Sequence, residues 1–463
     1  MMKNSLLKTL GIVTVIFAMS ACSGSSSSGE SGATSSNEVK VELKAPEQTS
    51  RSYTYEEVTA EGYLAFKNKL QVFSSRIAEA YIQQEKDASE SKEINQNLAI
   101  SPVSVELCLG LALSSASGET RNELLRAFGM NSGDYQTFKN YYHLYIDELS
   151  FEYPPSSLNQ ETLAKISFAN SLWADKTLNL NEATLDSLAN DYYCYSYQVD
   201  FQNNARKSNH EINKFVREKT DDFLSPQFDF PKETLLTLLN VIYLKDVWSD
   251  SESGLREVSG YSFTNHDGTV SNQKLLSGSY FSGKTIHTNA YSSFYTETKR
   301  GIRLYFIKAN GQEKLDSLST RDVFEHILDE DNIITKDDEK KEIYETSCVF
   351  PAFYSNADID LTKMLTDTFG INKLFTQGEC DFSNLTSNNN FYCQNMVQNA
   401  KLSVDKMGIE GAAITTTYYG DPYRETDYTI VKDTFVVDKE FAYVITKGNS
   451  NDILFSGVIT NTD

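Results

Sequence analysis

The sequence predicts an α+β fold, in which helices and strands occupy separate stretches of one large domain. Three observations support this prediction. Apolar residues recur at three- and four-residue steps through residues 63–81, as on one face of a helix. A nearly continuous apolar run at residues 235–244 is typical of a strand covered on both faces. Two more strand patterns, at residues 441–446 and 453–460, are joined by a turn-rich segment.

The hydrophobic fraction and the net charge of the chain limit the kinds of partner it can have. The chain has 463 residues, 40% of them hydrophobic, so it can bury a large core. Its formal net charge of -22 disfavours nucleic acid and anionic lipid surfaces as partners, because an acidic protein repels phosphates. We expect a monomer with an acidic surface.

The N-terminus has the pattern of a signal peptide. Lys3 and Lys8 precede an apolar run at residues 10–19, which is shorter than the ~20 residues needed to cross a bilayer. The small residues before Cys22 resemble a bacterial lipoprotein signal, in which Cys22 is lipidated and becomes the mature N-terminus. The predicted parts are a signal peptide (1–21), a Ser/Gly-rich flexible tether (22–55) and one domain (56–463). We expect an extracellular protein that is secreted or is held to the bacterial membrane only by this lipid.

No pattern in the chain indicates a cofactor, a metal site or an enzyme. The cysteines after Cys22 are Cys108, Cys194, Cys348, Cys380 and Cys393, an odd number without a CxxC pair, so neither a zinc site nor a complete disulfide framework is indicated. Cys380 and Cys393 could pair, although free thiols fit the pattern better. The histidines have no metal-binding spacing, and the nucleotide-binding and hydrolase motifs are absent.

Capping signals place three further helices. Polar residues 84–96 predict a loop after the first helix. Ser101 is a suitable N-cap and Pro102 suits the first helical position, before a run that is apolar nearly all round and is therefore expected to be buried. Thr120 with Glu123, and Ser208 with Glu211, have capping-box spacing, and the helix after Thr120 is expected to stop at Gly129.

Asn240 lies inside the apolar strand pattern. A buried amide needs hydrogen-bond partners, so we expect Asn240 to anchor a polar network; a solvated edge position is the alternative.

These segments together resemble the serpin family. Residues 97–113 followed by 118–124 resemble an N-terminal block of serpins, and the other blocks follow in the family's order and near its spacing. They are residues 169–173, 199–201, 212–213 with Thr220, 240–245 with Trp248, 350–353, 381–383, 404–413, and Phe441 with 454–458. The resemblance covers about residues 60–461.

The resemblance implies a fold and a mechanism. Helices pack around a large central mixed β-sheet and two smaller sheets, with an exposed reactive-centre loop at about residues 405–435. A serine protease cuts this loop, and the segment before the cut inserts into the main sheet while the protease is still covalently attached. The protein is then a suicide inhibitor whose partner is a serine protease of unknown identity.

The hinge implied by the resemblance comprises Gly408, Ile409, Glu410, Gly411, Ala412 and Ala413. From Gly408 to Thr417 all residues except Glu410 are small or β-branched. This composition suits a strand, although the segment has not yet formed one. With Ile409, Gly411 and Ala413 facing inward, every second residue is uncharged and Glu410 falls on the outer face. Gly408 supplies backbone freedom.

The resemblance also implies a polar cluster under the sheet, formed by Ser101, Ser104, Asn240 and Gln398. Gln398 stands where the family usually has His, and an amide can both donate and accept. Other departures are Lys406 and Met407 in place of an acidic pair, and Ile409 in place of a small residue, which could slow insertion. These departures favour the alternative, a non-inhibitory serpin-fold surface or binding protein.

The scissile bond cannot be found by counting, because the loop is long. The usual offset from Gly408 falls on Pro422, which is a poor scissile residue. Tyr423 would suit a chymotrypsin-like pocket and Arg424 a trypsin-like one, although Glu425 is unfavourable after Arg424. Their alternative role is that of solvated residues at a loop tip.

Overall fold

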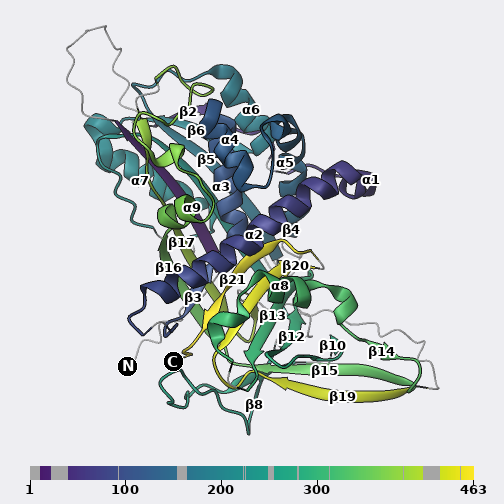
Figure 1. Cartoon of the computed structure of the whole chain (residues 1–463). Helices are drawn as coiled ribbons and strands as arrows, with labels where there is room; N and C mark the ends of the chain where they lie inside the picture. Colours follow the sequence, from purple (N-terminus) through teal and green to yellow (C-terminus); the bar gives the residue numbers. More distant parts are fainter. Residues whose placement is uncertain are drawn as a thin grey trace.

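The computed structural model describes residues 11–21, 40–48, 50–91, 93–153, 164–222, 224, 226–248, 255–278, 281–311, 313–388, 391–409, 428–448 and 450–462. Within these residues the chain forms nine α-helices and three sheets (Figure 1). The helices are α1 (Tyr55–Thr59), α2 (Glu61–Ala88), α3 (Pro102–Ser115), α4 (Gly118–Ala127), α5 (Tyr135–Leu149), α6 (Glu182–Tyr192), α7 (Phe201–Lys219), α8 (Arg321–Leu328) and α9 (Thr362–Asp367). The observed fold class is the predicted one.

The largest sheet is mixed and runs through the middle of the molecule. From one edge its strands are β16 (Phe353–Asp360), β17 (Phe391–Val404), β7 (Thr234–Val247), β5 (Ala164–Asp175), β6 (Cys194–Val199) and β2 (Lys40–Lys44), and β4 (Phe151–Tyr153) also pairs with β5. β1 (Gly11–Ala21) and β18 (Gly408–Ile409) both lie between β17 and β7. β5 and β6 are parallel, and the other neighbours are antiparallel.

Two smaller sheets pack at one end of the large one. The first contains β11 (Ile286–His287), β12 (Tyr291–Glu297), β13 (Ile302–Ala309), β20 (Phe441–Lys447), β21 (Ile453–Ile459) and β3 (Leu98–Ile100). The second contains β8 (Arg256–Val258), β9 (Leu275–Ser277), β10 (Phe281–Ser282), β14 (Lys336–Asp337), β15 (Glu342–Phe350) and β19 (Thr429–Val436). In Figure 1, β15 and β19 project at the end opposite β2 and α6.

The strongest sequence patterns form the expected elements. The stripe of residues 63–81 is the buried face of α2, and the apolar run 235–244 is β7. α3 begins as predicted, because the Ser101 side chain accepts a hydrogen bond from the Ser104 amide and Pro102 occupies the first turn. The loop expected at 84–96 starts later than predicted, because Gln, Glu and Lys are good helix formers and α2 continues to Ala88.

Both capping-box predictions were wrong: distant backbone groups bind Thr120 and Glu123, and the other helix begins before Ser208. The N-cap of α4 is Ser117, and the Thr120 hydroxyl instead accepts from the Asp381 amide at 3.0 Å. Glu123 accepts two backbone amide bonds from the segment at Asn372. α7 begins at Phe201, where the Asp200 side chain caps the Asn203 amide, so Ser208 lies inside the helix.

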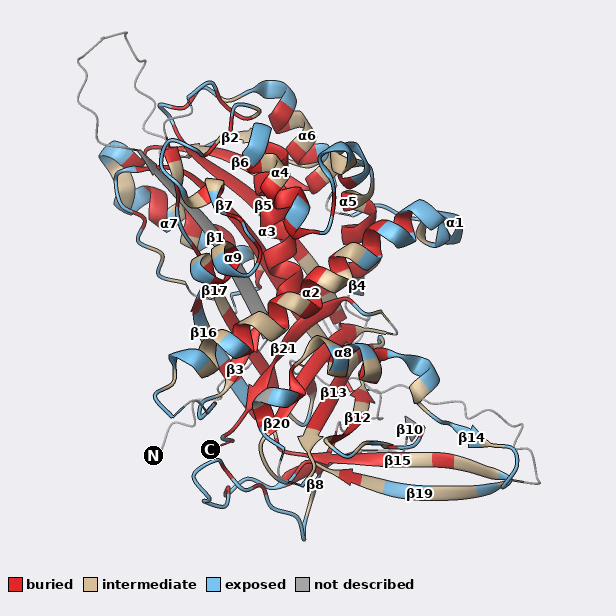
Figure 2. Cartoon of the chain, in the orientation of Figure 1, coloured by how far each residue is buried: buried red, intermediate tan, exposed pale blue. Residues whose placement is uncertain are grey.

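Buried residues fill the strands of the large sheet and the helix faces beside it (Figure 2). The apolar ones form two clusters, which the sheet separates. On one face of β7, Leu236, Leu238, Ile242 and Leu244 join the main core, where α3 packs on β7. On the other face, residues of β7 including Val241 pack under α7. Burial on both faces explains why the sequence of β7 is apolar without alternation.

The strand β2 lies before residue 56, where the sequence predicted the domain to start. Lys40–Lys44 lie inside the predicted tether, yet they pair with β6 at the edge of the large sheet. The Lys40 ammonium lies 4.2 Å from the centre of the Tyr197 ring, and Lys44 forms an ion pair with Asp186 on α6. β1 coincides with the apolar run predicted to be the signal region.

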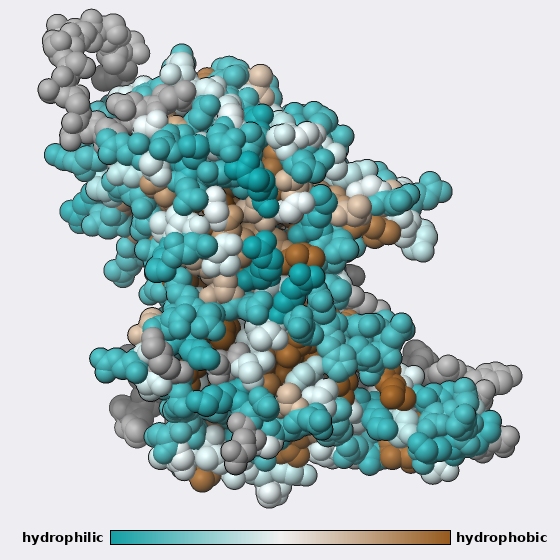
Figure 3. All heavy atoms as spheres, in the orientation of Figure 1, coloured by the Kyte–Doolittle hydropathy of each residue, from teal (hydrophilic) through white to brown (hydrophobic). Residues whose placement is uncertain are grey.

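Hydrophilic residues cover most of the face in Figure 3, and apolar residues show only in separate patches. This distribution agrees with the net charge of -22. No helix in the described part of the chain is both long and apolar enough to span a membrane.

Candidate functional site

The large sheet contains a slot between β7 and β17. These two strands do not pair with each other; each pairs antiparallel with the strands between them. β1 fills most of the slot, pairing from Leu244 to Thr234 on β7 and from Lys401 to Phe391 on β17. The slot therefore accepts at least eleven residues of extended backbone, the length of β1.

β18 enters the same slot from the end nearest the smaller sheets. Gly408 pairs with Val247, and Ile409 pairs with Asp246 on one side and with Val404 on the other. Extending β18 in the same register would place residue 411 opposite Leu244, the position that Gly11 of β1 occupies. The match is the same on β17, where residue 412 would face Lys401, the partner of Ile12. β1 thus lies where a continuation of β18 would lie.

The predicted hinge residues Gly408 and Ile409 are at the mouth of the slot. The Asp405 carboxylate accepts from the Met407 and Gly408 amides at 2.7 and 3.3 Å, which holds the turn that precedes β18. Ile409 is fully buried in the main core. The bulk of Ile409, which could slow insertion, is therefore accommodated at this end of the slot.

Asp246 at the mouth of the slot was not found by sequence reasoning. Its side chain is fully buried opposite Ile409. It accepts hydrogen bonds from the Thr298 hydroxyl at 2.5 Å and from the Arg300 and Val247 amides at 2.9 Å each. The one available sequence signal for Asp246 was its position two residues after the run 235–244, which was predicted to form a buried strand.

The four residues of the predicted polar cluster lie together beneath the slot. Gln398 makes two bonds to the Ser101 backbone, accepting from its amide and donating to its carbonyl at 3.0 Å each. The Ser104 hydroxyl donates to Asn240 Oδ1 at 2.5 Å, and the Ser104 amide donates to Ser101 Oγ at 3.3 Å. The cluster thus connects β17, the start of α3 and β7.

Asn170 of β5 extends this cluster and was missed. Asn240 Nδ2 donates to Asn170 Oδ1 at 2.8 Å, and Asn170 Nδ2 donates to the Tyr192 carbonyl at 2.7 Å. Like Asn240, Asn170 is an amide within a buried strand, and that pattern was the signal that could have found it.

Several predicted site residues lie outside the described residues. They are Cys22, the hinge residues Glu410, Gly411, Ala412 and Ala413, and the reactive-bond candidates Tyr423, Arg424 and Glu425. Among the described cysteines, Cys380 and Cys393 are buried free thiols, and burial raises the pKa of Cys380 to about 12. No group of three or more His, Cys, Asp or Glu residues in the described ranges could hold a metal ion.

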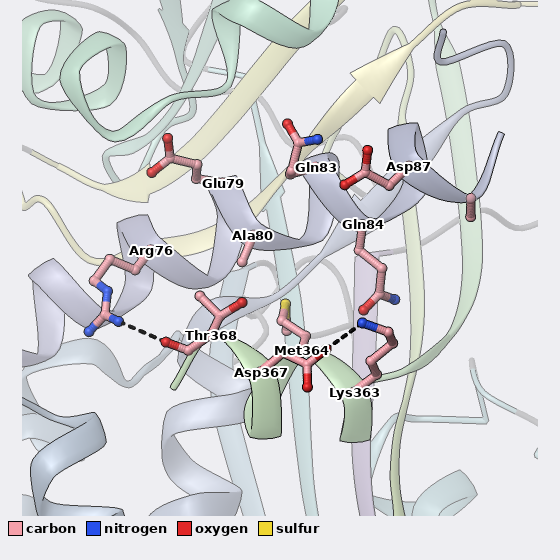
Figure 4. A pocket seen from close by; sticks show the side chains of 11 residues that line it. Arg76, Glu79, Ala80, Gln83, Gln84, Asp87, Lys363, Met364, Asp367 and Thr368 are labelled. Carbon is pink, nitrogen blue, oxygen red and sulfur yellow. Dashed lines mark hydrogen bonds and ion pairs between the residues drawn. The ribbon is translucent and has the colours of Figure 1, made fainter. Parts of the chain in front are cut away.

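A separate groove of about 580 Å³ lies between α2 and α9 (Figure 4). The Arg76 side chain closes one end by donating to the Thr368 carbonyl at 3.3 Å, and Lys363 forms an ion pair with Asp367. The lining includes none of the predicted site residues.

Known proteins share this fold and sequence pattern. Human neuroserpin is 23% identical over 381 residues, which cover 80% of this chain and 87% of that protein. Iripin-1 of Ixodes ricinus is 25% identical over 374 residues, covering 79% of this chain and 89% of that protein. Among solved structures, native tengpin, a thermophilic serpin, has a TM-score of 0.65 at 17% identity and covers 91% of this chain and 99% of its own. Thyroxine-binding globulin in complex with thyroxine also has a TM-score of 0.65, at 19% identity, with coverage of 84% and 99%.

A family model described as serpin (serine protease inhibitor) matches residues 85–462, which include β17, β18, β7 and the polar cluster beneath them. The chain therefore belongs to the serpin family.

Proposed function

We propose that this protein inhibits a serine protease by inserting its cleaved loop between β7 and β17. The observation that carries the proposal is the shared register of β18 and β1. The loop is already started as a strand at the mouth, and the slot ahead of it pairs with extended backbone along both edges. Only the segment after Ile409 has to be added, in the register that β18 has begun.

The catalytic groups for this reaction belong to the target protease. Its catalytic serine attacks a loop carbonyl, forms an ester with the residue before the cut and releases the following residue as a new N-terminus. Tyr423 and Arg424 are the proposed acyl-forming residues. An inserted strand of ~12 residues at ~3.3 Å each would carry the bound protease about 40 Å along the sheet. This displacement traps the protease before the ester is hydrolysed, and the chain itself acts as an inhibitor, not an enzyme.

The register assigns a face to each inserted residue. Residues 411 and 413 would face Leu244 and Ile242, which point into the main core. Glu410 would lie opposite Lys245 on the other face, where a partly exposed ammonium can offset its charge. The composition of the loop therefore suits both faces of the slot.

The expected location fits this mechanism. We propose that residues 1–21 are removed and that a lipid on Cys22 holds the protein outside the cell. Removal would also take β1 out of the slot and leave it open to the loop. β2 and the projecting strands β15 and β19 lie at opposite ends of the molecule (Figure 1). A lipid tether that leads to β2 would therefore leave the end with β15 and β19 directed away from the membrane.

A second candidate is a non-inhibitory binding protein. The groove between α2 and α9 favours it, because a concave site of about 580 Å³ has the size of a small-molecule pocket. Thyroxine-binding globulin in complex with thyroxine shows that a protein of this fold can hold a small molecule.

One experiment separates the candidates. The chain that begins at Cys22 is incubated with a panel of chymotrypsin-like and trypsin-like proteases, and the products are run on a denaturing gel. An inhibitor yields a protease complex that survives boiling, and its cleaved form melts at a much higher temperature. Cleavage without a complex and without a gain in melting temperature rules out the inhibitory function.

A further inference from the structure

A small pocket beside α8 gathers basic side chains without an acidic one. It has a volume of about 320 Å³ and lies between β11 with the two residues before it and α8 with the segment that follows. Its lining includes Lys284, Thr285, Ile286, His287, His326 and Ile334. No lining residue is Asp or Glu, although acidic residues outnumber Lys and Arg by 64 to 42 in the chain. The groove between α2 and α9, by contrast, is lined by Glu79, Asp87 and Asp367.

Hydrogen bonds fix the ring of His287. Asn310 Nδ2 donates to the Thr288 carbonyl at 2.9 Å, and Asn310 Oδ1 therefore accepts from the Ser292 hydroxyl at 3.0 Å. Because this bond uses the proton of Ser292, its Oγ accepts from Nδ1–H of His287 at 2.8 Å. Nε2 of His287 has no partner among the described residues and is the nitrogen that can bind a ligand.

His326 on α8 is held by the neighbouring residue of β12. Its Nδ1 is hydrogen-bonded to the Tyr291 hydroxyl, and the two rings meet edge to face with their centres 5.9 Å apart. Asn332 donates to the His326 carbonyl at 2.9 Å, which ties the turn Glu330–Asn332 to α8. Within the described ranges Nε2 of His326 has no partner either. Two imidazoles thus line one pocket, each with one nitrogen bound and the other available.

Two further polar groups of the lining have no partner of their own kind in the part of the chain that the structure describes. Thr285 is 5% exposed, and its Oγ1 makes no hydrogen bond. Lys284 Nζ lies 4.8 Å from the centre of the Tyr344 ring and forms no ion pair. Buried hydroxyls rarely stay unpaired, and a ligand in the pocket would supply the missing bond.

We propose that this pocket binds a small organic anion, namely a carboxylate with a short apolar part. The Lys284 ammonium, the Thr285 hydroxyl and the two Nε2–H groups of protonated rings would donate to the carboxylate. Protonation of the His287 ring keeps its bond to Ser292, because Nδ1 is already the donor there.

The rest of the lining limits the size and nature of the ligand. Ile286 and Ile334 offer apolar surface beside the donors, and Ile334 is 48% exposed without a ligand. A volume of about 320 Å³ is at the lower end of the range for small-molecule sites. A metal cation does not fit, because only the two imidazoles are customary metal ligands and the Lys284 ammonium would repel the ion. The inference does not depend on the inhibitory function, since the pocket shares no residue with the slot.

The test uses the five histidines of the chain as reporters. The full chain is labelled with ¹³C in its histidine rings and titrated with benzoate at constant pH and ionic strength. We expect the ring signals of His287 and His326 to shift to saturation, and those of His143, His210 and His266 to stay in place. His287→Gln and His326→Gln assign the two signals by their loss. Benzamide, which has the shape of benzoate without the charge, should shift neither.

Two variants test the donors. Lys284→Met should weaken benzoate binding about tenfold, because a charge-assisted contact is lost, whereas Lys232→Met, at an exposed lysine outside the pocket, should bind as the parent does. Thr285→Val should also weaken binding, but it should not lower the denaturation midpoint of the free protein, because the hydroxyl has no partner there.

Three results would overturn the inference. The first is benzoate that shifts neither ring signal or shifts all five alike. The second is a Lys284→Met variant that keeps the parent's affinity. The third is zinc chloride that shifts the two signals where benzoate does not, which would assign the pocket to a cation. Inorganic phosphate that binds as tightly as benzoate would overturn the role given to Ile286 and Ile334.

Discussion

The Ser104 hydroxyl donates a hydrogen bond to Asn240 Oδ1 at 2.5 Å, and this bond joins α3 to the strand that forms one edge of the slot. Asn240 also donates to Asn170. One amide thus satisfies polar groups on two other elements in the fully buried centre of the sheet.

Asn240→Ala should lower the stability of the protein by about 1–3 kcal/mol, because Ser104 and Asn170 each lose a partner in the buried interior. The measurement is the denaturation midpoint in guanidinium chloride. Asn140→Ala, at an exposed position on α5, is the matched control and should change little. An Asn240→Ala variant that unfolds at the parent's midpoint contradicts the role given to this cluster.

Ala413→Glu should convert the inhibitor into a substrate. In the register that β18 begins, residue 413 faces Ile242, so the added carboxylate would enter the core only when the loop is inserted. Its desolvation costs several kcal/mol in that state alone. The uncleaved variant should melt like the parent, be cut by the target and form no stable complex on a denaturing gel. Ala413→Val adds bulk without charge and should still form the complex; loss of the complex in both variants would assign the effect to size.

Residues 11–21 should block insertion for as long as they remain attached, because β1 occupies both edges of the slot. We expect the full chain to gain no heat resistance when its loop is cut, whereas the chain that begins at Cys22 gains it. Val15→Pro in the full chain removes a backbone donor from the middle of β1 and should restore the gain. Equal heat resistance of the cut full chain and the cut shortened chain would show that β1 does not hold the slot.

Cys22 should carry a lipid in protein isolated from its source. Mass spectrometry of the mature N-terminal peptide is expected to show Cys22 as its first residue with diacylglyceryl and acyl additions. Cys22→Ser should leave the protein unprocessed and without a lipid. An unmodified Cys22, or cleavage at another residue, would refute the proposed anchor.

Glu106 should make stability fall as the pH rises. Its carboxyl is buried on α3, accepts from Ser74 at 2.6 Å and from Tyr145 at 2.9 Å, and burial raises its pKa well above the usual value. The folded state then holds a proton that the unfolded state releases near pH ~4.3. Stability from this group is complete below that pH and declines above it by up to about 1.4 kcal/mol per pH unit until the folded-state pKa is passed.

Glu106→Gln removes this titration. Its denaturation midpoint should approach the parent's at pH 4 and exceed it increasingly towards pH 7. Glu218→Gln, at an exposed position on α7, should follow the parent at every pH. A constant difference between Glu106→Gln and the parent across this range would show that Glu106 does not change its protonation.

The sequence by itself determined the elements whose patterns arise from burial and local capping. The stripe of α2, the doubly buried run of β7 and the cap at Ser101 follow from periodicity and from side-chain chemistry within a few residues. The resemblance to serpins also brought Ser101, Ser104, Asn240 and Gln398 together, although they come from three separate stretches of the chain.

The tertiary structure alone decided how polar groups are used when a distant partner competes with a local one. Thr120 and Glu123 have capping-box spacing, yet they bind backbone amides more than 240 positions along the chain, at Asp381 and Asn372. The same holds for Asp246, whose partners Thr298 and Arg300 lie 52 and 54 positions away. A local sequence pattern describes which groups a side chain can bind. Folding selects among these partners by burial, because a buried polar group without a hydrogen bond costs more free energy than a local helix cap contributes.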